Sequence, residues 1–164
     1  MLTEETYRQA VEKYADSVFR FVLKSTQDED LSKDIVQEAF SKMWEKRNTI
    51  EFTKSKSWLF TTAYRLLLND VRRKSVARTF SEREKPASQP HKKYTQFELK
   101  DTIDKALEQL PHIQKSILLL RDLEGYSYDD IGEILDLSAA KVKVYLFRAR
   151  GKVKALLKNK LVFS

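Results

Sequence analysis

The chain has 164 residues and a formal net charge of +7, with 41% hydrophobic residues, 34% charged residues and only three glycines and three prolines. This composition favours a mostly helical protein of one medium or two small domains, and the basic excess fits a polyanionic partner. The absence of cysteine excludes disulfides and thiolate metal sites. Residues 1–14 lack the apolar core of a signal peptide, and no apolar run reaches about 18 residues. We therefore expect a cytoplasmic protein without direct membrane insertion.

Three amphipathic helices are predicted in residues 1–75, which we expect to form a first domain. Apolar residues recur at intervals of three and four from Tyr7 to Leu23, and a second helix is predicted from about Leu31 to Arg47. A third helix is predicted from about Ser55 to Arg73. In the second helix, the expected inward stripe is Val36, Phe40, Met43 and Trp44, and the opposite face carries Asp34, Gln37, Glu38, Ser41 and Glu45.

A less regular stretch separates this domain from the rest of the chain. Residues 76–96 contain two of the three prolines and little apolar periodicity, which is typical of a flexible linker. An extended segment that lies in a groove of a partner fits the same composition. Residues 97–164 predict four further helices in a small second domain, with Ile103 directed toward its core and Gly125 at a helix end.

The strongest functional pattern lies at residues 127–157, which predict a helix, a tight turn and a second helix. Ser127 and Ser138 have the side chain and the position expected of helix N-caps. Gly132 lies where a small residue allows the two helices to approach each other. In the second helix, one buried stripe is predicted, formed by Val142, Leu146, Ala149 and Val153.

The opposite face of that second helix is suited to the major groove of duplex DNA. From Lys141 to Lys160 the chain carries eight Lys or Arg and no acid, whereas residues 97–140 carry ten Asp or Glu and four Lys or Arg. Cations bind phosphates and guanine edges, and Val144 and Phe147 would contact thymine methyl groups. A solvated basic face is the alternative, but water gives no reason to expose two such apolar side chains. The predicted contacts are Ser138, Ala140, Lys141, Lys143, Val144, Phe147 and Arg148. The acidic segment should repel nucleic acid, and we expect it to face protein.

A second basic stretch, residues 54–74, combines six Lys or Arg with aromatic residues and a single acid. Cations that hold phosphates beside rings that stack on bases are typical of single-stranded DNA binding. Aromatic residues at helical spacing are equally typical of a protein core. We expect Trp58 to be buried, and we expect Phe60 and Tyr64, which share one helix face, to be exposed.

Three segments resemble the extracytoplasmic-function (ECF) group of bacterial RNA polymerase sigma factors. DIVQEAFSKMWE (Asp34 to Glu45) and WLFTTAYRLLLNDVRRK (Trp58 to Lys74) are similar to sigma region 2. LPHIQKSILLLRDLEGYSYDDIGEILDLS (Leu110 to Ser138) is similar to sigma region 4. The segments occur in the order and at the spacing of the family. The chain departs from the family pattern at Arg65, where Asn is usual, and at Asn69, where Asp is usual.

The resemblance implies an all-α protein with region 2 at residues 1–75, a linker at 76–96 and region 4 at 97–164. It implies no catalytic residue, no cofactor and no metal. The implied partners are core RNA polymerase, promoter DNA, as −35 duplex and as −10 single strand, and an anti-sigma factor. Polymerase binding is implied for Asp34, Gln37, Glu38 and Ser41. Recognition and melting of the −10 element are implied for Lys56, Phe60, Tyr64, Arg65, Asn69, Arg72 and Arg73.

Other functions fit parts of the chain. A stand-alone helix-turn-helix regulator would use residues 1–75 for dimerisation or sensing and would prefer a palindromic duplex, but it leaves the region 2 segments unexplained. A metal-dependent nuclease needs clustered carboxylates, and the adjacent Asp28, Glu29 and Asp30 are expected in a solvated turn. A helical scaffold protein would leave both basic, aromatic faces without a role.

Overall fold

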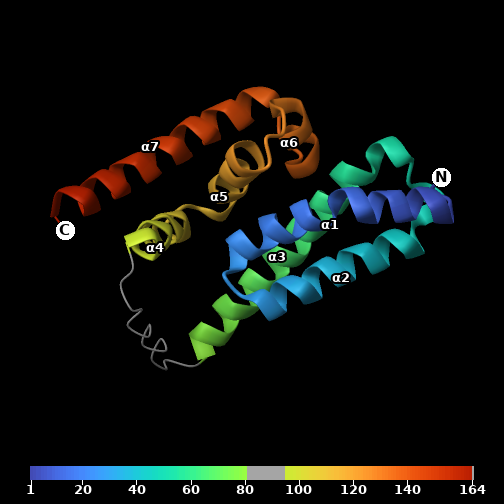
Figure 1. The fold of residues 1–164 in the computed structure, drawn as a ribbon, viewed down its shortest axis with the longest axis horizontal. Coiled ribbons are helices and arrows are strands. Elements are labelled where there is room, and N and C mark those ends of the chain that lie inside the picture. Colours follow the sequence, from blue (N-terminus) through green and yellow to red (C-terminus); the bar gives the residue numbers. More distant parts are fainter. Residues whose placement is uncertain (81–94, 164) are drawn as a thin grey trace.

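The computed structural model describes residues 1–80 and 95–163, which form two helical bundles packed against each other (Figure 1). The first bundle contains α1 (Glu4–Thr26), α2 (Glu29–Glu45) and α3 (Ser55–Phe80). The second contains α4 (Thr95–Glu108), α5 (His112–Leu118), α6 (Tyr128–Leu135) and α7 (Ala139–Phe163). Two 3₁₀ turns, Arg47–Thr49 and Phe52–Lys54, join α2 to α3, and a π-helical turn, Leu119–Leu123, extends α5. The expected all-α class is confirmed, and none of the described helices combines the length and apolar character needed to cross a membrane.

Side-chain caps set the start of the first two helices. The Thr6 N–H donates to the Thr3 hydroxyl at 3.1 Å, and the Thr3 N–H donates to the Thr6 hydroxyl at 2.7 Å. The Asp28 carboxylate accepts from the Leu31 N–H at 3.1 Å and caps α2, whose first turn contains Glu29 and Asp30. Helix initiation therefore explains these adjacent acids. The described residues contain no group of three or more His, Asp or Glu that could hold a metal ion.

The inward face of α2 differs from the predicted stripe. The residues that α2 buries are Ser32, Ile35, Ala39, Phe40 and Met43. Trp44, predicted in that stripe, is 38% exposed. Ile35, Ala39 and Met43 lie four residues apart along the buried side of α2. Trp44 follows Met43 directly, so its side chain points about 100° away from that side around the helix. The Trp44 ring instead meets Tyr7 edge-on, with 4.9 Å between ring centroids, and the Arg47 guanidinium lies 4.1 Å from its centre.

Helix α3 is longer than the sequence pattern predicts. It continues to Phe80 rather than ending near Arg73, so residues 76–80, expected in the linker, are helical. Residues 81–94, which contain most of the expected linker, lie outside the described part of the chain. The α3 side chains of Leu59, Phe60, Ala63 and Leu67 are at most 1% exposed.

Turn residues set the helix ends of the second bundle as predicted. Gly125 has a φ of 75°, a left-handed conformation that glycine adopts without strain, and its position after the extended α5 helix ends that helix. The Ser127 hydroxyl accepts from the Asp130 N–H at 3.1 Å and caps α6. The Ser138 hydroxyl accepts from the Lys141 N–H at 3.2 Å and caps α7.

At the turn between α6 and α7, the backbone near Leu137 passes so close to position 132 that glycine is required there. Gly132 is buried, its carbonyl accepts from the Leu137 N–H at 2.9 Å, and a Cβ at this position would clash with the Leu137 carbonyl oxygen. Beyond the turn, Val142, Leu146 and Ala149 are at most 2% exposed. The predicted helix-turn-helix packing is therefore confirmed at the turn and for these three stripe residues, whereas Val153, the fourth residue of the predicted stripe, is only half-buried.

Gly132→Ala is predicted to lower the free energy of unfolding by about 1–3 kcal/mol, because backbone rather than a flexible side chain must move to admit the methyl group. Gly151→Ala is the matched control, because Gly151 lies inside α7 and a Cβ there would meet nothing within 4 Å. This control is expected to raise the same free energy by about 0.5–1 kcal/mol. Urea unfolding of both variants checks the pair, and wild-type stability in Gly132→Ala would contradict the close approach.

The two bundles share one continuous hydrophobic core. The Phe60 ring of α3 packs against Phe21 of α1, with 5.7 Å between ring centroids, and against Tyr126 of the second bundle at 5.1 Å. The Tyr64 ring of α3 stacks on His112 of α5 at 5.5 Å, with 14° between the ring planes. Aromatic contacts of this kind stabilise an interface beyond the apolar area that they bury.

Ion pairs and hydrogen bonds surround this aromatic centre, and all four of the ion pairs have the same polarity. Cations of the first bundle meet acids of the second in Arg20–Glu124 (2.9 Å), Lys24–Asp104 (3.2 Å), Lys54–Glu133 (2.9 Å) and Lys56–Asp130 (3.0 Å). The buried Lys115 donates to the Ser25 carbonyl oxygen at 2.7 Å, and the Thr61 hydroxyl donates to the Ile134 carbonyl oxygen at 2.8 Å. The acidic segment thus faces protein as expected, and that protein is the first bundle.

His112 is predicted to make stability depend on pH. Burial and the nearby Lys115 ammonium lower the pKa of the His112 imidazole below its usual 6.5, and its buried Nε2 has no hydrogen-bond partner among the described residues. The unfolded chain binds this proton more readily than the folded chain does. The free energy of unfolding should therefore fall as the pH is lowered through about 6.5. Urea midpoints for wild type and His112→Gln at about pH 7.5 and 5.5 check this. Equal losses in both proteins would contradict it.

Candidate nucleic-acid and protein interfaces

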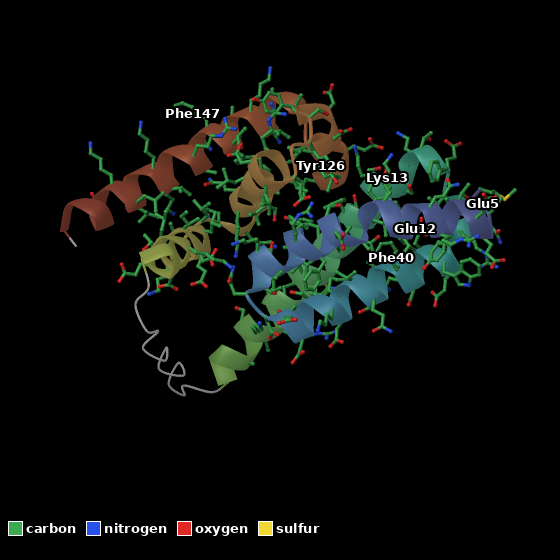
Figure 2. All side chains as sticks on the ribbon, viewed as in Figure 1. Glu5, Glu12, Lys13, Phe40, Tyr126 and Phe147 are labelled. Atoms are coloured by element: carbon green, nitrogen blue, oxygen red, sulfur yellow. The ribbon has the colours of Figure 1, made fainter. Side chains whose placement is uncertain are left out.

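The outer face of α7 presents the predicted duplex contacts to solvent. Phe147 is 81% exposed and Val144 is 48% exposed, so the apolar exposure expected from the sequence is confirmed. Figure 2 marks the position of Phe147 on this long helix. The other exposed side chains of the predicted set are Ser138, Ala140, Lys141, Lys143 and Arg148. The turn and the buried stripe thus direct all seven residues away from the core.

A shallow hollow of about 280 Å³ opens on this face. Its walls are Ala140, Lys141, Val144, Tyr145 and Arg148. Apolar walls beside two cations are complementary to a thymine methyl group next to a phosphate. Tyr145 was not among the predicted contacts, because its position lies between the buried stripe and the exposed face, and it also packs partly against the core.

One predicted DNA contact is tied to the first helix of the helix-turn-helix. The Lys143 ammonium lies 5.4 Å from the centre of the Tyr128 ring, at the start of α6, and the Arg121 guanidinium lies 4.7 Å from the same ring. Arg121 also donates to the Tyr126 carbonyl oxygen at 2.8 Å. These cation–π contacts hold one cation of α7 and one cation of the turn that extends α5 against the Tyr128 ring.

The acidic face predicted on α2 is exposed along the whole helix. Asp34, Gln37, Glu38 and Ser41 follow at steps of three and four and are all exposed. The one ion pair described on this face joins Glu38 to Lys42 at 3.9 Å, a surface contact that contributes little to stability. The helix lies on the side of the first bundle away from α7 (Figure 1). The face is therefore available to a basic protein surface.

Helix α3 divides the residues predicted to contact the −10 strand between two faces. One face is exposed and carries Arg65, Asn69, Arg72 and Arg73. The other carries Lys56, Phe60 and Tyr64 and lies against the second bundle. The prediction that Phe60 is exposed is wrong, because Tyr126 and Phe21 enclose its ring completely. Tyr64 is half-buried, and Trp58, predicted to be buried, is half-buried as well.

The surroundings of this covered face favour the charged form of its carboxyl groups and the neutral form of its buried phenol. Hydrogen bonds from Lys56 and Lys54 lower the pKa of the Asp130 and Glu133 carboxyls respectively. Burial raises the pKa of the Tyr64 phenol. Both ammonium groups at the start of α3, those of Lys54 and Lys56, are therefore paired with carboxylates of α6. Lys54 was not among the predicted contacts.

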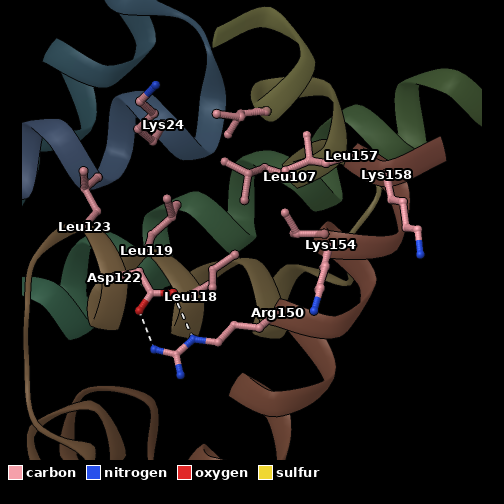
Figure 3. Close-up of a pocket in the computed structure, with 12 residues that line it drawn as sticks. Lys24, Leu107, Leu118, Leu119, Asp122, Leu123, Arg150, Lys154, Leu157 and Lys158 are labelled. Carbon is pink, nitrogen blue, oxygen red and sulfur yellow. Dashed lines mark hydrogen bonds and ion pairs between the residues drawn. The ribbon is translucent and has the colours of Figure 1, made fainter. Parts of the chain in front are cut away.

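An apolar groove of about 770 Å³ lies among α4, α5 and α7 (Figure 3). Its apolar lining is Ile103, Leu107, Leu118, Leu119, Leu123, Val153 and Leu157. Its rim carries Lys24, Arg150, Lys154 and Lys158, and Arg150 donates two hydrogen bonds to the Asp122 carboxylate. Ile103, predicted in the core, is 37% exposed here. Sequence periodicity did not reveal the groove, because an apolar stripe facing an open groove has the same spacing as one facing a filled core.

Two protein-family models match the chain. The model described as sigma-70 region 2 matches residues 10–76, and the model described as sigma-70, region 4 matches residues 100–153. The first match covers most of the first bundle, and the second runs from α4 into the middle of α7. Each match therefore corresponds to one of the two bundles.

Named relatives match along nearly the whole chain. The ECF RNA polymerase sigma factor SigM of Bacillus subtilis is 29% identical over 163 residues, which cover 95% of each protein. The RNA polymerase sigma-H factor of Pseudomonas aeruginosa is 26% identical, over 92% of this chain and 93% of that protein.

Solved structures share the arrangement of helices. The sigma factor RpoE of Bartonella quintana, solved in complex with the anti-sigma factor NepR, has a TM-score of 0.75 at 24% identity, covering 93% of this chain and 96% of that chain. CnrH, solved with the cytosolic domain of CnrY, has a TM-score of 0.74 at 20% identity, covering 96% and 90%. At these identities the likeness shows the fold.

Proposed function

Because the chain belongs to the ECF group of RNA polymerase sigma factors, we propose that it binds core RNA polymerase and directs it to a specific set of promoters. It acts in the bacterial cytoplasm and performs no covalent chemistry of its own. One observation carries this proposal. Both sigma regions occur in order on one chain, and each presents an exposed face of the required chemistry.

Region 4, residues 97–164, reads the −35 element as duplex. The exposed face of α7 enters the major groove, where Lys143 and Arg148 bind guanine edges or phosphates. Val144 and Phe147 contact thymine methyl groups. The 81% exposure of Phe147 supports this assignment, because an aromatic ring gains nothing from lying in water beside a basic stripe.

Region 2, residues 1–75, recognises and melts the −10 element. Melting follows from capture of unstacked bases of the non-template strand, with cations on its phosphates and aromatic rings against its bases. The exposed Arg65, Asn69, Arg72 and Arg73 form a continuous polar, mostly cationic track along α3. Lys56, Phe60 and Tyr64 lie on the other face of α3, under the second bundle, and contact the strand only where that bundle is displaced.

Polymerase binding uses the exposed acidic face of α2, with Asp34, Gln37, Glu38 and Ser41 against a basic surface of the core enzyme. A further protein partner is an anti-sigma factor, as in the two solved complexes that share this fold. The groove among α4, α5 and α7 suits an amphipathic helix of such a partner, since it has an apolar floor and a cationic rim.

The wild-type chain, labelled with a fluorophore, is predicted to form a tight one-to-one complex with bacterial core RNA polymerase in the absence of DNA. Fluorescence anisotropy during titration measures this directly. Binding to duplex DNA without binding to polymerase would instead identify a stand-alone helix-turn-helix regulator.

Asp34→Lys combined with Glu38→Lys is predicted to weaken polymerase binding at least tenfold, because like charges then face each other across the interface. Folding should be unchanged, since both residues are exposed. The matched control reverses two exposed acids on α1, Glu5→Lys and Glu12→Lys, and should bind as wild type does. Equal affinities for the two double variants would remove the α2 face from the proposed interface.

Lys143→Ala and Arg148→Ala are each predicted to weaken binding to −35 duplex DNA about fivefold or more, while polymerase binding stays at the wild-type level. Lys100→Ala, which removes an exposed cation from α4, is the control for net charge. Competition titrations with a duplex pool selected on the wild-type holoenzyme provide the measurement. Loss of polymerase association in either variant would show that the α7 face binds protein instead of DNA.

A further inference from the structure

One ring at the start of α6 contacts a cation of the proposed duplex-binding face. Tyr128 is the first residue of α6 and directly follows the Ser127 N-cap. Its side chain is half-buried and packs against the hydrophobic core. The Lys143 ammonium of α7 lies 5.4 Å from the centre of this ring. That distance is within the range of about 6 Å over which the face of a tyrosine ring attracts an ammonium group.

The Tyr128 ring is itself held in place. The Arg121 guanidinium lies 4.7 Å from the ring centre. Arg121 also donates to the Tyr126 carbonyl oxygen at 2.8 Å, which ties the guanidinium to the backbone just before α6. A ring that packs against the core on one side and against a fixed guanidinium on another has few alternative positions. The exposed Lys143 side chain therefore has one preferred direction, toward α6.

Lys143 lies apart from the hollow on the outer face of α7. The walls of that hollow are Ala140, Lys141, Val144, Tyr145 and Arg148. Successive residues of an α-helix are rotated by about 100°, which places Lys143 on one side of Phe147 and the walls of the hollow on the other. The hollow has two cations of its own, Lys141 and Arg148. The part of the face that is shaped to receive a base therefore does not include Lys143.

The direction of Lys143 decides which part of the DNA it can reach. In a helix-turn-helix, the second helix enters the major groove and the first helix crosses the sugar-phosphate backbone. The Tyr128 ring belongs to the first helix and draws the Lys143 ammonium toward it. An ammonium group has three donors, so contact with the ring leaves donors for a phosphate oxygen.

We propose that Tyr128 is a positioning residue for −35 recognition, which holds the Lys143 ammonium beside α6, where it binds a backbone phosphate and not a base edge. This role rests on the proposed binding of −35 duplex by α7. It deepens that function, because it separates a cation that positions the protein on the duplex from the residues that read sequence. A lysine that is held before DNA binds loses less side-chain freedom on binding, so the ring raises affinity without touching DNA.

The salt dependence of binding tests the phosphate contact. The probe is a labelled duplex selected from a random pool on the wild-type holoenzyme. Each phosphate neutralised by a cation contributes about 0.9 to the slope of log K against log salt concentration. Lys143→Met in the holoenzyme should therefore reduce the magnitude of this slope by about one. Lys100→Met removes an exposed cation of α4 and should leave the slope unchanged.

Base preference provides a second readout of the same contact. A set of duplexes is prepared in which each differs from the selected sequence at one base pair. Lys143→Met should weaken binding to every member by the same factor, about fivefold. A loss confined to one or two base pairs would show that Lys143 reads a base edge and would overturn the phosphate assignment. An unchanged salt slope would overturn it as well.

A double-mutant cycle tests whether Tyr128 acts through Lys143. Tyr128→Leu alone should weaken binding to the selected duplex about threefold, because the ring no longer holds the ammonium. In the Lys143→Met background, the same substitution should have no further effect. Tyr128→Phe keeps the face of the ring and should bind as wild type does.

A purely structural role of Tyr128 would give other results. Equal losses from Tyr128→Leu in both Lys143 backgrounds would overturn the positioning role, and equal losses from Tyr128→Phe and Tyr128→Leu would assign the effect to the hydroxyl instead. Phenylalanines with increasing numbers of fluorines at position 128 test the contact without a loss of packing, because fluorine withdraws charge from the ring face at nearly constant size. Affinity should fall stepwise with fluorine number, and constant affinity would contradict the cation–π contact.

Failure of the proposed function would have a different signature. A wild-type holoenzyme that selects no duplex from the pool would contradict the −35 assignment of α7, and the role of Tyr128 would fall with it. Selection of a duplex by the wild type, together with wild-type affinity in Tyr128→Leu, would leave the proposed function standing and overturn only the positioning role.

Discussion

Phe60 of α3 is buried from two sides, by Phe21 of its own bundle and by Tyr126 of the other, and the arrangement of the two bundles depends on this packing. Burial of a phenylalanine side chain contributes about 1.5–3 kcal/mol, which the first bundle alone would not gain in full. The apolar residues of α3 therefore need cover on more than one face. The second bundle provides it, and in doing so covers the surface that we assign to the −10 strand.

Charge divides the second bundle into an acidic part and a basic part with different surroundings. Region 4 carries its acids between residues 97 and 140, where Asp104, Glu124, Asp130 and Glu133 meet cations of region 2. It carries its cations from residue 141 onward, on a helix whose outer face points to solvent. The acidic segment is thus an internal counterpart to these four cations of the first bundle, and the outer basic face of α7 stays exposed to solvent.

The sequence correctly predicted the features that depend on local spacing. It did not predict which side chains become buried when the two bundles pack against each other. The caps at Ser127 and Ser138, the close approach at Gly132 and the exposure of Phe147 follow from residue type and helical period, and the structure confirms them. The period also placed Phe60 and Tyr64 on one face correctly. It could not show that a partner bundle covers that face, because the aromatic spacing of a DNA-binding surface equals that of a core. The exposure of Ile103 in the groove was missed for the same reason. The roles assigned to individual residues in polymerase and promoter binding remain predictions.

The central claim is that the exposed acidic face of α2 binds core RNA polymerase. A photo-crosslinker attached to the thiol of Ser41→Cys tests it most directly, because Ser41 is exposed and the chain has no other thiol. The account predicts that Ser41→Cys crosslinks to a subunit of core polymerase, whereas Glu12→Cys, at an exposed position of α1, does not. Absence of a crosslink from Ser41→Cys, or equal crosslinking from both positions, would contradict it.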